Sequence, residues 1–276
     1  MLAPHWFIPK DGKPHQPTAR GVRAGRKEGR HSLAMSAAFV GTHSAVDRTS
    51  IACRAAGTIP FLCCSSSTKD VAEQPKMTKI AIVYYSMYGH VRALALEVKK
   101  GLESAGCNVT LLRVAETLPD EVLKKMGAPG IGKEDEEATA VKLAEYDGFM
   151  FGLSARFGMM PAQMKALLDS TGGLWQSGAL LGKPAGIFFS TGTQNGGQET
   201  AAFTFLTQLV HHGMIFVPMG YSNPLLFDLK EPHGGSPYGA GTLAGPDGSR
   251  TPSDLEKKVA VHHGEHFASA AKKLTA

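Results

Sequence analysis

Cysteine is scarce in this chain of 276 residues, and the few cysteines are unevenly placed. Three of the four lie within the first 64 residues, and only Cys107 lies beyond them. A disulfide framework needs several spaced cysteines, so this distribution argues against one and favours a reducing compartment. Cys107 follows a glycine and precedes a predicted strand, so we interpret it as a small buried hydrophobic residue and not as a nucleophile.

Long hydrophobic runs are also missing, and the net positive charge comes from the start of the chain. No stretch approaches the roughly eighteen apolar residues that a membrane-spanning helix requires. The formal net charge of +5 divides into +7 for residues 1–69 and −2 for residues 70–276. A nucleic-acid-binding domain needs a basic face, so the near-neutral second part argues against that class of protein.

Three signatures of nucleotide and hydrolase sites are absent. The chain has no Walker pattern, and no G-x-G-x-x-G follows the first predicted strand, which argues against a nucleoside triphosphatase and a Rossmann dinucleotide domain. The stretch Gly152-Leu-Ser-Ala-Arg156 lacks the second glycine of the G-x-S-x-G elbow of α/β hydrolases.

The cluster of His262, His263 and His266 has no second group of ligands to complete a metal site, so we interpret it as a solvated helix face and predict no metal.

Residues 1–77 show no sustained hydrophobic period. They are rich in arginine and serine and poor in acids, a composition typical of an organellar transit peptide. We therefore predict a disordered leader over residues 1–77 that directs the chain to a plastid or mitochondrion; without such a signal the protein would be cytoplasmic. Met35 and Met77 are alternatives to Met1 as the true start.

A regular alternation of buried runs and helical patterns begins at residue 78 and continues to residue 276. Predicted strands cover residues 79–85, 108–114, 147–152, 185–189 and 214–218. Predicted helices cover residues 91–105, 119–126, 161–171, 199–211 and a last segment from residue 251. The apolar runs do not alternate with polar residues, as in strands buried on both faces. We therefore predict an α/β domain over residues 78–276, with a doubly wound five-stranded parallel sheet and helices on both faces.

Polar, glycine-bearing loops follow the first, third and fourth predicted strands. These loops cover residues 86–90, 153–158 and 190–197. In a parallel sheet they share one edge, where ligands of doubly wound folds bind. Gly89 and the free N–H groups of the following helix would suit an anion. The convergence of these loops predicts a phosphorylated cofactor, and a flavodoxin-like sheet suits a mononucleotide.

Two further segments are expected to form loops: residues 127–137, which we expect to be mobile, and residues 220–250, whose length indicates a functional role.

Seven motifs in this domain resemble the WrbA family of flavodoxin-like NAD(P)H:quinone oxidoreductases, which bind FMN. The motifs are residues 84–90 (YYSMYGH), 156–158 (RFG), 171–175 (TGGLW), 190–193 (STGT), 197–199 (GQE), 211–214 (HHGM) and 235–239 (GSPYG). The resemblance implies an enzyme that reduces quinones by two electrons in a ping-pong mechanism, with NADH or NADPH as the donor. It also implies a homotetramer whose active sites draw on neighbouring subunits.

The resemblance further implies which residues form the site. The expected FMN-binding residues are Ser86, Met87, Tyr88, Gly89, His90, Val91, Ala155, Arg156, Phe157, Ser190, Thr191, Gly192, Thr193, Gln194, Asn195 and His211. Tyr88 would also contact the nicotinamide donor, and Trp175, expected on a glycine-rich loop, would contact the quinone. No side chain is expected to act as a catalytic acid or base, because the flavin carries the chemistry. The chain departs from the family pattern at Ser154-Ala155, where Pro-Thr is usual, and at Gln194-Asn195, where glycine is usual.

A flavodoxin-type electron carrier without turnover of its own is the alternative function. Such carriers are strongly acidic, for docking to basic partners. The charge of −2 over residues 70–276 and the long segment 220–250 both favour the enzyme. No residue pattern in the sequence marks a preference between NADH and NADPH.

Overall fold

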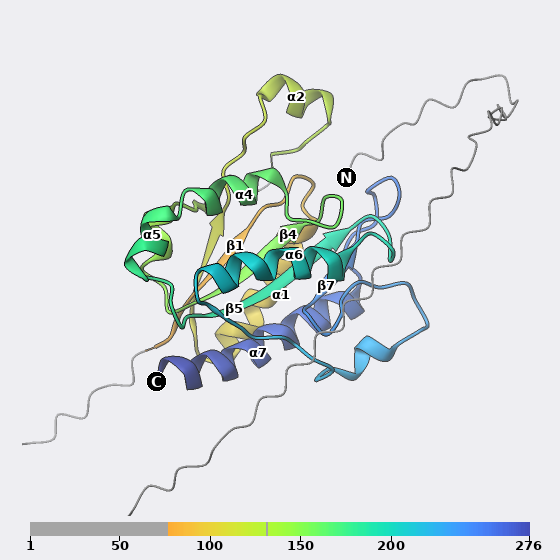
Figure 1. The fold of residues 1–276 in the computed structure, drawn as a ribbon. Helices are drawn as coiled ribbons and strands as arrows, with labels where there is room; N and C mark the ends of the chain where they lie inside the picture. Colours follow the sequence, from red (N-terminus) through yellow and green to blue (C-terminus); the bar gives the residue numbers. More distant parts are fainter. Residues whose placement is uncertain (1–76, 131) are drawn as a thin grey trace, which may run out of the picture. The chain divides into compact units, whose positions relative to one another are not determined.

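The computed structural model describes residues 77–130 and 132–276, so the predicted leader lies outside the described residues except for Met77. A parallel sheet of seven strands forms the centre of this part (Figure 1). The strands are β1 (Lys79–Tyr84), β2 (Asn108–Arg113), β3 (Glu136–Glu137), β4 (Gly148–Ser154), β5 (Pro184–Thr191), β6 (Ile215–Phe216) and β7 (Gly241–Leu243). Their order is β3-β2-β1-β4-β5-β6, and β7 also pairs with β5. The central order β2-β1-β4-β5 reproduces the flavodoxin-like arrangement.

Helices cover both faces of the sheet (Figure 1). They are α1 (His90–Ser104), α2 (Asp120–Lys125), α3 (Ala140–Leu143), α4 (Ala162–Asp169), α5 (Gly172–Ser177), α6 (Gln198–His211), α7 (Asp254–Thr275) and the 3₁₀ helix η1 (Pro224–Phe227). Alternate residues of β1 pack on opposite faces of the sheet, because successive side chains of a strand point to opposite sides. Ile80 and Ile82 pack in the core beneath α1 and α7. Ala81 and Val83 pack in the core beneath α4 and α6. Within the described residues, no helix has the length and apolar content to cross a membrane.

All five predicted strands are confirmed, but the predicted strand count was too low. Strands β3 and β7 lie in the two segments that the sequence predicted as loops. They have only two and three residues, too few to give a recognisable period. Each gains its backbone partners from a longer neighbour, β2 and β5 respectively.

Two local predictions were wrong. Gly172 and Gly173 do not end a helix but begin α5, so Trp175 lies on a helix and not on a glycine-rich loop. The helix ends instead at Gly178, which has the left-handed φ of 68° that glycine adopts without strain. His263 is not on a solvated face. It is fully buried, its Nδ1 accepts the N–H of Ala240 at 3.2 Å, and burial lowers its pKa to about 3.

Cys107 and the remaining histidines of α7 fit a structural role. Cys107 is buried, as predicted, and burial raises the pKa of its thiol. His262 Nε2 lies 2.8 Å from the hydroxyl of Ser222. Among the residues that the structure describes, no group of three or more histidines, cysteines or acids is placed to hold a metal ion.

Helices α1 and α7 pack together through two facing glycines. A Cβ atom added to Gly101 of α1 would collide with the carbonyl oxygen of Val261. One added to Gly264 of α7 would collide with the carbonyl oxygen of Val98. The absence of side chains at these two positions therefore lets the helix backbones approach each other.

We expect Gly101→Ala to lower the free energy of unfolding by about 2 kcal/mol, because the added methyl group overpacks this helix contact. Intrinsic helix propensity alone would raise the free energy of unfolding of the alanine variant by about 1 kcal/mol. Gly173→Ala in α5 is the matched control, since nothing lies within 4 Å of its added Cβ. Urea unfolding measures both variants. A Gly101→Ala variant as stable as the wild type would show that the helices do not need this close approach.

Candidate functional site

The loops after β1, β4 and β5 meet at the carboxyl edge of the sheet. The register pairs Tyr84 with Gly152 and Ser154 with Ser190, so these strands end beside one another. A small cavity opens between their loops. Its lining residues are Ser86, Met87, Tyr88, His90, Ser154, Arg156, Ser190, Thr191 and Ala244. The structure therefore brings the three predicted cofactor-binding segments together.

The turn between β1 and α1 has the form of an anion site. Gly89 has a φ of 98°, which favours glycine, and it occupies the N-cap of α1. Its N–H donates to the hydroxyl of Ser86 at 3.1 Å. No side chain caps the helix, and no acidic residue lies in its first turn. The N–H groups and the positive end of the helix dipole are thus available to a phosphate group.

His90, the first residue of α1, is held by the chain segment before α7. Its Nε2 lies 2.9 Å from the carbonyl oxygen of Arg250. A carbonyl oxygen only accepts, so Nε2 carries a proton in this contact. Burial lowers the pKa of His90, although the contact with the Arg250 carbonyl opposes that shift. The Arg250 carbonyl therefore orients the ring of His90 beside the phosphate loop.

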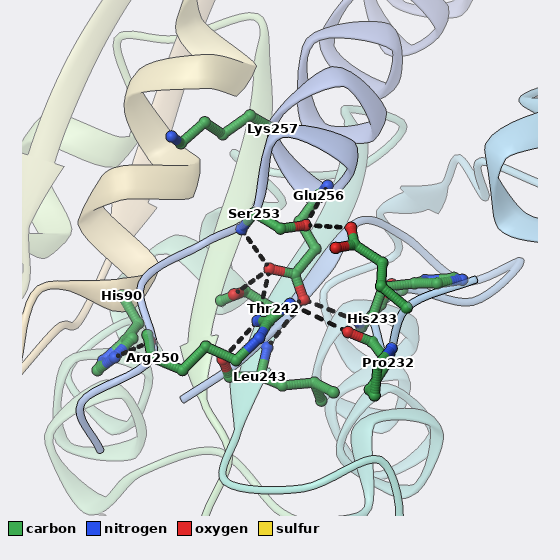
Figure 2. Close-up of polar contacts among 12 residues, drawn as sticks. His90, Pro232, His233, Thr242, Leu243, Arg250, Ser253, Glu256 and Lys257 are labelled. Atoms are coloured by element: carbon green, nitrogen blue, oxygen red, sulfur yellow. Dashed lines mark hydrogen bonds and ion pairs between the residues drawn. The ribbon is translucent and has the colours of Figure 1, made fainter. Parts of the chain in front are cut away.

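The Arg250 carbonyl is positioned by a buried ion pair with Glu256 of α7 (Figure 2). The Glu256 side chain is fully buried, and Arg250 Nη1 lies 2.8 Å from its Oε2 and 3.0 Å from its Oε1. The remaining donors to Glu256 are the N–H groups of Gly234, Leu243 and Ser253 and the hydroxyl of Thr242. A buried carboxylate is tolerated when its oxygens are satisfied in this way.

The same network fastens the long segment 220–250. Arg250 also donates to the carbonyl oxygens of Leu243 at 2.7 Å and Pro232 at 3.0 Å. Glu256 and Arg250 therefore tie this segment to α7 at one end and to His90 at the other (Figure 2). The sequence analysis missed both residues. The available signal was the capping box Ser253-x-x-Glu256, in which the hydroxyl of Ser253 and the carboxylate of Glu256 bind each other's N–H groups.

The loop after β4 forms a tight hairpin turn with an exposed aromatic tip. Arg156 and Met159 exchange backbone hydrogen bonds of 2.8 and 2.9 Å, and Phe157 and Gly158 between them both have positive φ. A positive φ is costly for phenylalanine, and such strain is concentrated at functional sites. The side chain of Phe157 is 99% exposed. Ala155, which departs from the family pattern, is buried and gives its N–H to the carbonyl of Ser190 at 3.0 Å.

The loop after β5 accommodates the second departure from the pattern. Ser190, Thr191 and Gly192 are buried at the end of the strand, whereas Thr193, Gln194 and Asn195 are exposed. Neither Gln194 nor Asn195 has a positive φ. The left-handed conformation of this loop lies at Gly197, with a φ of 84°. The larger side chains therefore stand in solvent without straining the turn.

Trp175 and His211 lie apart from these loops within one chain. Helix α6 leaves the carboxyl edge at Gly197 and returns across the sheet, which places His211 at the opposite edge. There the N–H of Gly182, just before β5, donates to the carbonyl of Gly213 at 2.8 Å. Trp175 lies between α4 and β5 at that same edge and is 63% exposed. Of the two adjacent histidines, His212 is the structural one: it is buried, with Nε2 2.8 Å from the hydroxyl of Thr171.

Comparison with known proteins identifies the family. The sequence model of a family described as NADPH-dependent FMN reductase matches residues 78–223. The chain is similar to the quinone-oxidoreductase QR2 of Triphysaria versicolor, with 60% identity over 200 residues, which cover 71% of this chain and 97% of that protein. It is 53% identical over 197 residues to the NAD(P)H quinone oxidoreductase PST3 of Candida albicans, covering 71% of this chain and 98% of that protein. The chain belongs to the NADPH-dependent FMN reductase family.

A third relative is longer than the segment that matches this chain. The probable NAD(P)H dehydrogenase (quinone) FQR1-like 2 of Arabidopsis thaliana is 52% identical over 209 residues, which cover 75% of this chain and 76% of that protein. Together with the family match, these relatives confirm the predicted resemblance to WrbA-type proteins.

We expect Glu256→Gln to lower the free energy of unfolding by about 3 kcal/mol, because it leaves a partly buried Arg250 without its carboxylate. The control is Asp254→Asn in the first turn of the same helix. Asp254 is 92% exposed, and its carboxylate lies 3.5 Å from the ammonium of Lys257, so its loss should cost less than about 1 kcal/mol. Urea unfolding of both variants measures the difference. Equal losses of unfolding free energy in the two variants would contradict a larger contribution from the Arg250–Glu256 ion pair than from an exposed one.

Proposed function

We propose that this protein is an FMN-dependent NAD(P)H:quinone oxidoreductase that reduces a quinone to its hydroquinone by two electrons. The observation that carries the proposal is the cavity at the carboxyl edge, in a chain 60% identical to a quinone-oxidoreductase. Three loops with predicted cofactor residues converge there, beside the uncapped start of α1. The family match adds support for FMN as the cofactor.

The residues at this edge fit FMN. The first N–H groups of α1, with Ser86 to Val91, would hold the phosphate. Ala155, Arg156 and Phe157, together with residues 190–195, would border the ring system. When bound, FMN supplies the redox chemistry, taking a hydride from NADH or NADPH and passing two electrons to the quinone. The chain binds and orients the reactants, and solvent can supply the protons of the hydroquinone.

In this proposal Tyr88 would contact the nicotinamide donor. It lies on the phosphate loop and lines the cavity, and its hydroxyl donates to the carbonyl of Met126 at 3.1 Å. This contact holds the phenol ring at the mouth of the site. Donor and quinone would use the same opening in turn, which gives ping-pong kinetics.

Assembly into a homotetramer would complete the site. Trp175 and His211 lie at the edge opposite to the cofactor loops, so only another subunit could bring them to the flavin. Large apolar side chains that are exposed in the single chain would be covered in such an assembly. They include Phe157, Trp175, Leu181, Phe203 and Val210. In the tetramer, Trp175 would form an aromatic wall of the quinone site.

Residues 78–276 form the catalytic domain in this proposal, and residues 1–77 precede it as a leader. The match to QR2 supports the division, because 200 residues of this chain account for 97% of that protein. The arginine- and serine-rich composition of the leader supports targeting to a plastid or mitochondrion.

Reduction of a water-soluble benzoquinone tests the function directly. We expect the FMN-loaded protein to oxidise NADH or NADPH with the quinone as acceptor, and its flavin to bleach with the nucleotide alone. A protein that stays colourless after FMN is added would contradict the proposal. A yellow protein whose flavin remains oxidised with both nucleotides would instead be an electron carrier.

We expect Trp175→Ala to raise the quinone KM about threefold to tenfold, since aromatic stacking contributes about 0.5–1.5 kcal/mol. Binding of FMN should remain nearly unchanged. Tyr221→Ala is the matched control, because Tyr221 is exposed to a similar extent, 64% against 63% for Trp175. Equal KM values for Trp175→Ala and wild type would remove Trp175 from the quinone site.

Dilution tests the shared site. We expect activity per bound flavin to fall as the assembly dissociates, while FMN stays bound. Light scattering at each concentration reports the assembly state. Constant activity per flavin in a demonstrated monomer would show that a single chain forms the whole site.

A further inference from the structure

A cavity of the described residues lies beside the proposed cofactor site and is wider than the small cavity at the carboxyl edge. It has a volume of about 460 Å³ and opens between the carboxyl ends of β1 and β2, α2 and the loop that follows α2. This volume lies within the range of small-molecule sites, roughly 300–1,000 Å³. Neither the sequence motifs nor the proposed roles of the loops account for it.

This cavity adjoins the proposed cofactor site. Ser86 and Met87 line both the large cavity and the small one at the carboxyl edge. The hydrogen bond from Tyr88 to the carbonyl of Met126 joins the phosphate loop to the end of α2, beside the cavity. A molecule that reaches the flavin over Tyr88 could therefore extend into this space.

Three cations line the cavity, and they have unused hydrogen-bonding capacity. Arg113 pairs with Glu137 at 3.2 Å, but its Nε is buried without a hydrogen-bond partner. Lys124 and Lys133 form no ion pair within residues 77–130 and 132–276. An unsatisfied buried N–H costs free energy, so it indicates a missing acceptor.

Two carboxylates also line the cavity, and one of them is fully engaged. Glu116 accepts from the hydroxyl of Tyr85 at 2.6 Å, from Gln163 at 2.7 Å and from two backbone N–H groups. Asp120 lies at the exposed start of α2. Two lysines of the lining thus lack a paired acid in the described part of the chain, and Arg113 Nε adds a donor without an acceptor there, which favours an anionic ligand.

One side of the cavity is apolar. Leu118, Leu123, Ala128 and Pro129 line the cavity on the side of α2. A flat aromatic base could pack on such a wall while the cations contact a phosphate. Because neighbouring strands are about 4.8 Å apart, the ends of β5 and β2 lie roughly 14 Å apart, a gap that the two riboses and the pyrophosphate of a dinucleotide would bridge.

We infer that this cavity binds the 2′-phosphoadenosine end of NADPH, with Arg113, Lys124 and Lys133 contacting the 2′-phosphate. The inference rests on the proposed function, which places the nicotinamide end at the flavin beside Tyr88. It makes NADPH the preferred donor over NADH, since NADH lacks the phosphate that the three cations recognise.

Calorimetry on the FMN-loaded protein tests the site without turnover, with adenosine 2′,5′-bisphosphate and AMP as probes. We expect the bisphosphate to bind at least tenfold more tightly than AMP. The double variant Lys124→Ala/Lys133→Ala should lose this difference. Lys125→Ala is the matched control, because Lys125 is the next residue of α2 and does not line the cavity; it should keep the wild-type preference.

Steady-state kinetics gives a second readout. The double variant should raise the KM for NADPH about tenfold and change the KM for NADH less than twofold. Equal binding of the two probes to the wild type, or an unchanged preference in the double variant, would overturn the inference, while quinone reduction would still support the proposed function. If neither nucleotide reduced the quinone, the function would fail, and the calorimetry would still decide whether the cavity binds the bisphosphate.

Discussion

All strands of the sheet run in the same direction, and the position of every proposed ligand depends on this constraint. Parallel strands place their carboxyl ends, and the loops that follow them, along one edge. The loop after β1 supplies the uncapped start of α1, and the loops after β4 and β5 lie beside it. The helices that return across the faces carry Trp175 and His211 to the other edge. One topology thus forms the proposed cofactor site and places Trp175 and His211 at a distance from it within one chain.

The buried carboxylate of Glu256 extends this arrangement to the segment 220–250. This glycine-rich segment has little regular structure beyond η1 and the three residues of β7. Here Glu256 and Arg250 bind its backbone at several points, and the Arg250 carbonyl fixes the ring of His90 beside the phosphate loop. Burial of these charges is costly, and full satisfaction of the carboxylate offsets that cost. The segment therefore supports the site through His90 and closes it on the side of Ala244.

The long elements were predictable from the sequence because their signals are strong. Strands β1, β4 and β5 are continuous apolar runs, and each is followed by a polar loop with glycine, so the sheet and its binding edge followed from pattern alone. Strands β3 and β7 have no period and exist through pairing with longer neighbours. The helix at Gly172–Ser177 was missed because glycine tolerates both helix and turn. The cavity beside β2 could not be foreseen either, since it joins residues from β1, β2 and α2 that no single motif contains.

The central claim is that the flavin binds at the carboxyl edge of one subunit and is completed by a neighbour. A crystal structure of the FMN-loaded protein with a bound quinone tests it most directly. The account predicts the FMN phosphate at the start of α1, its ring between the loops after β4 and β5, and Trp175 of another subunit beside the quinone. A phosphate bound elsewhere, or a quinone enclosed by residues of a single chain with Trp175 remote from it, would contradict the account.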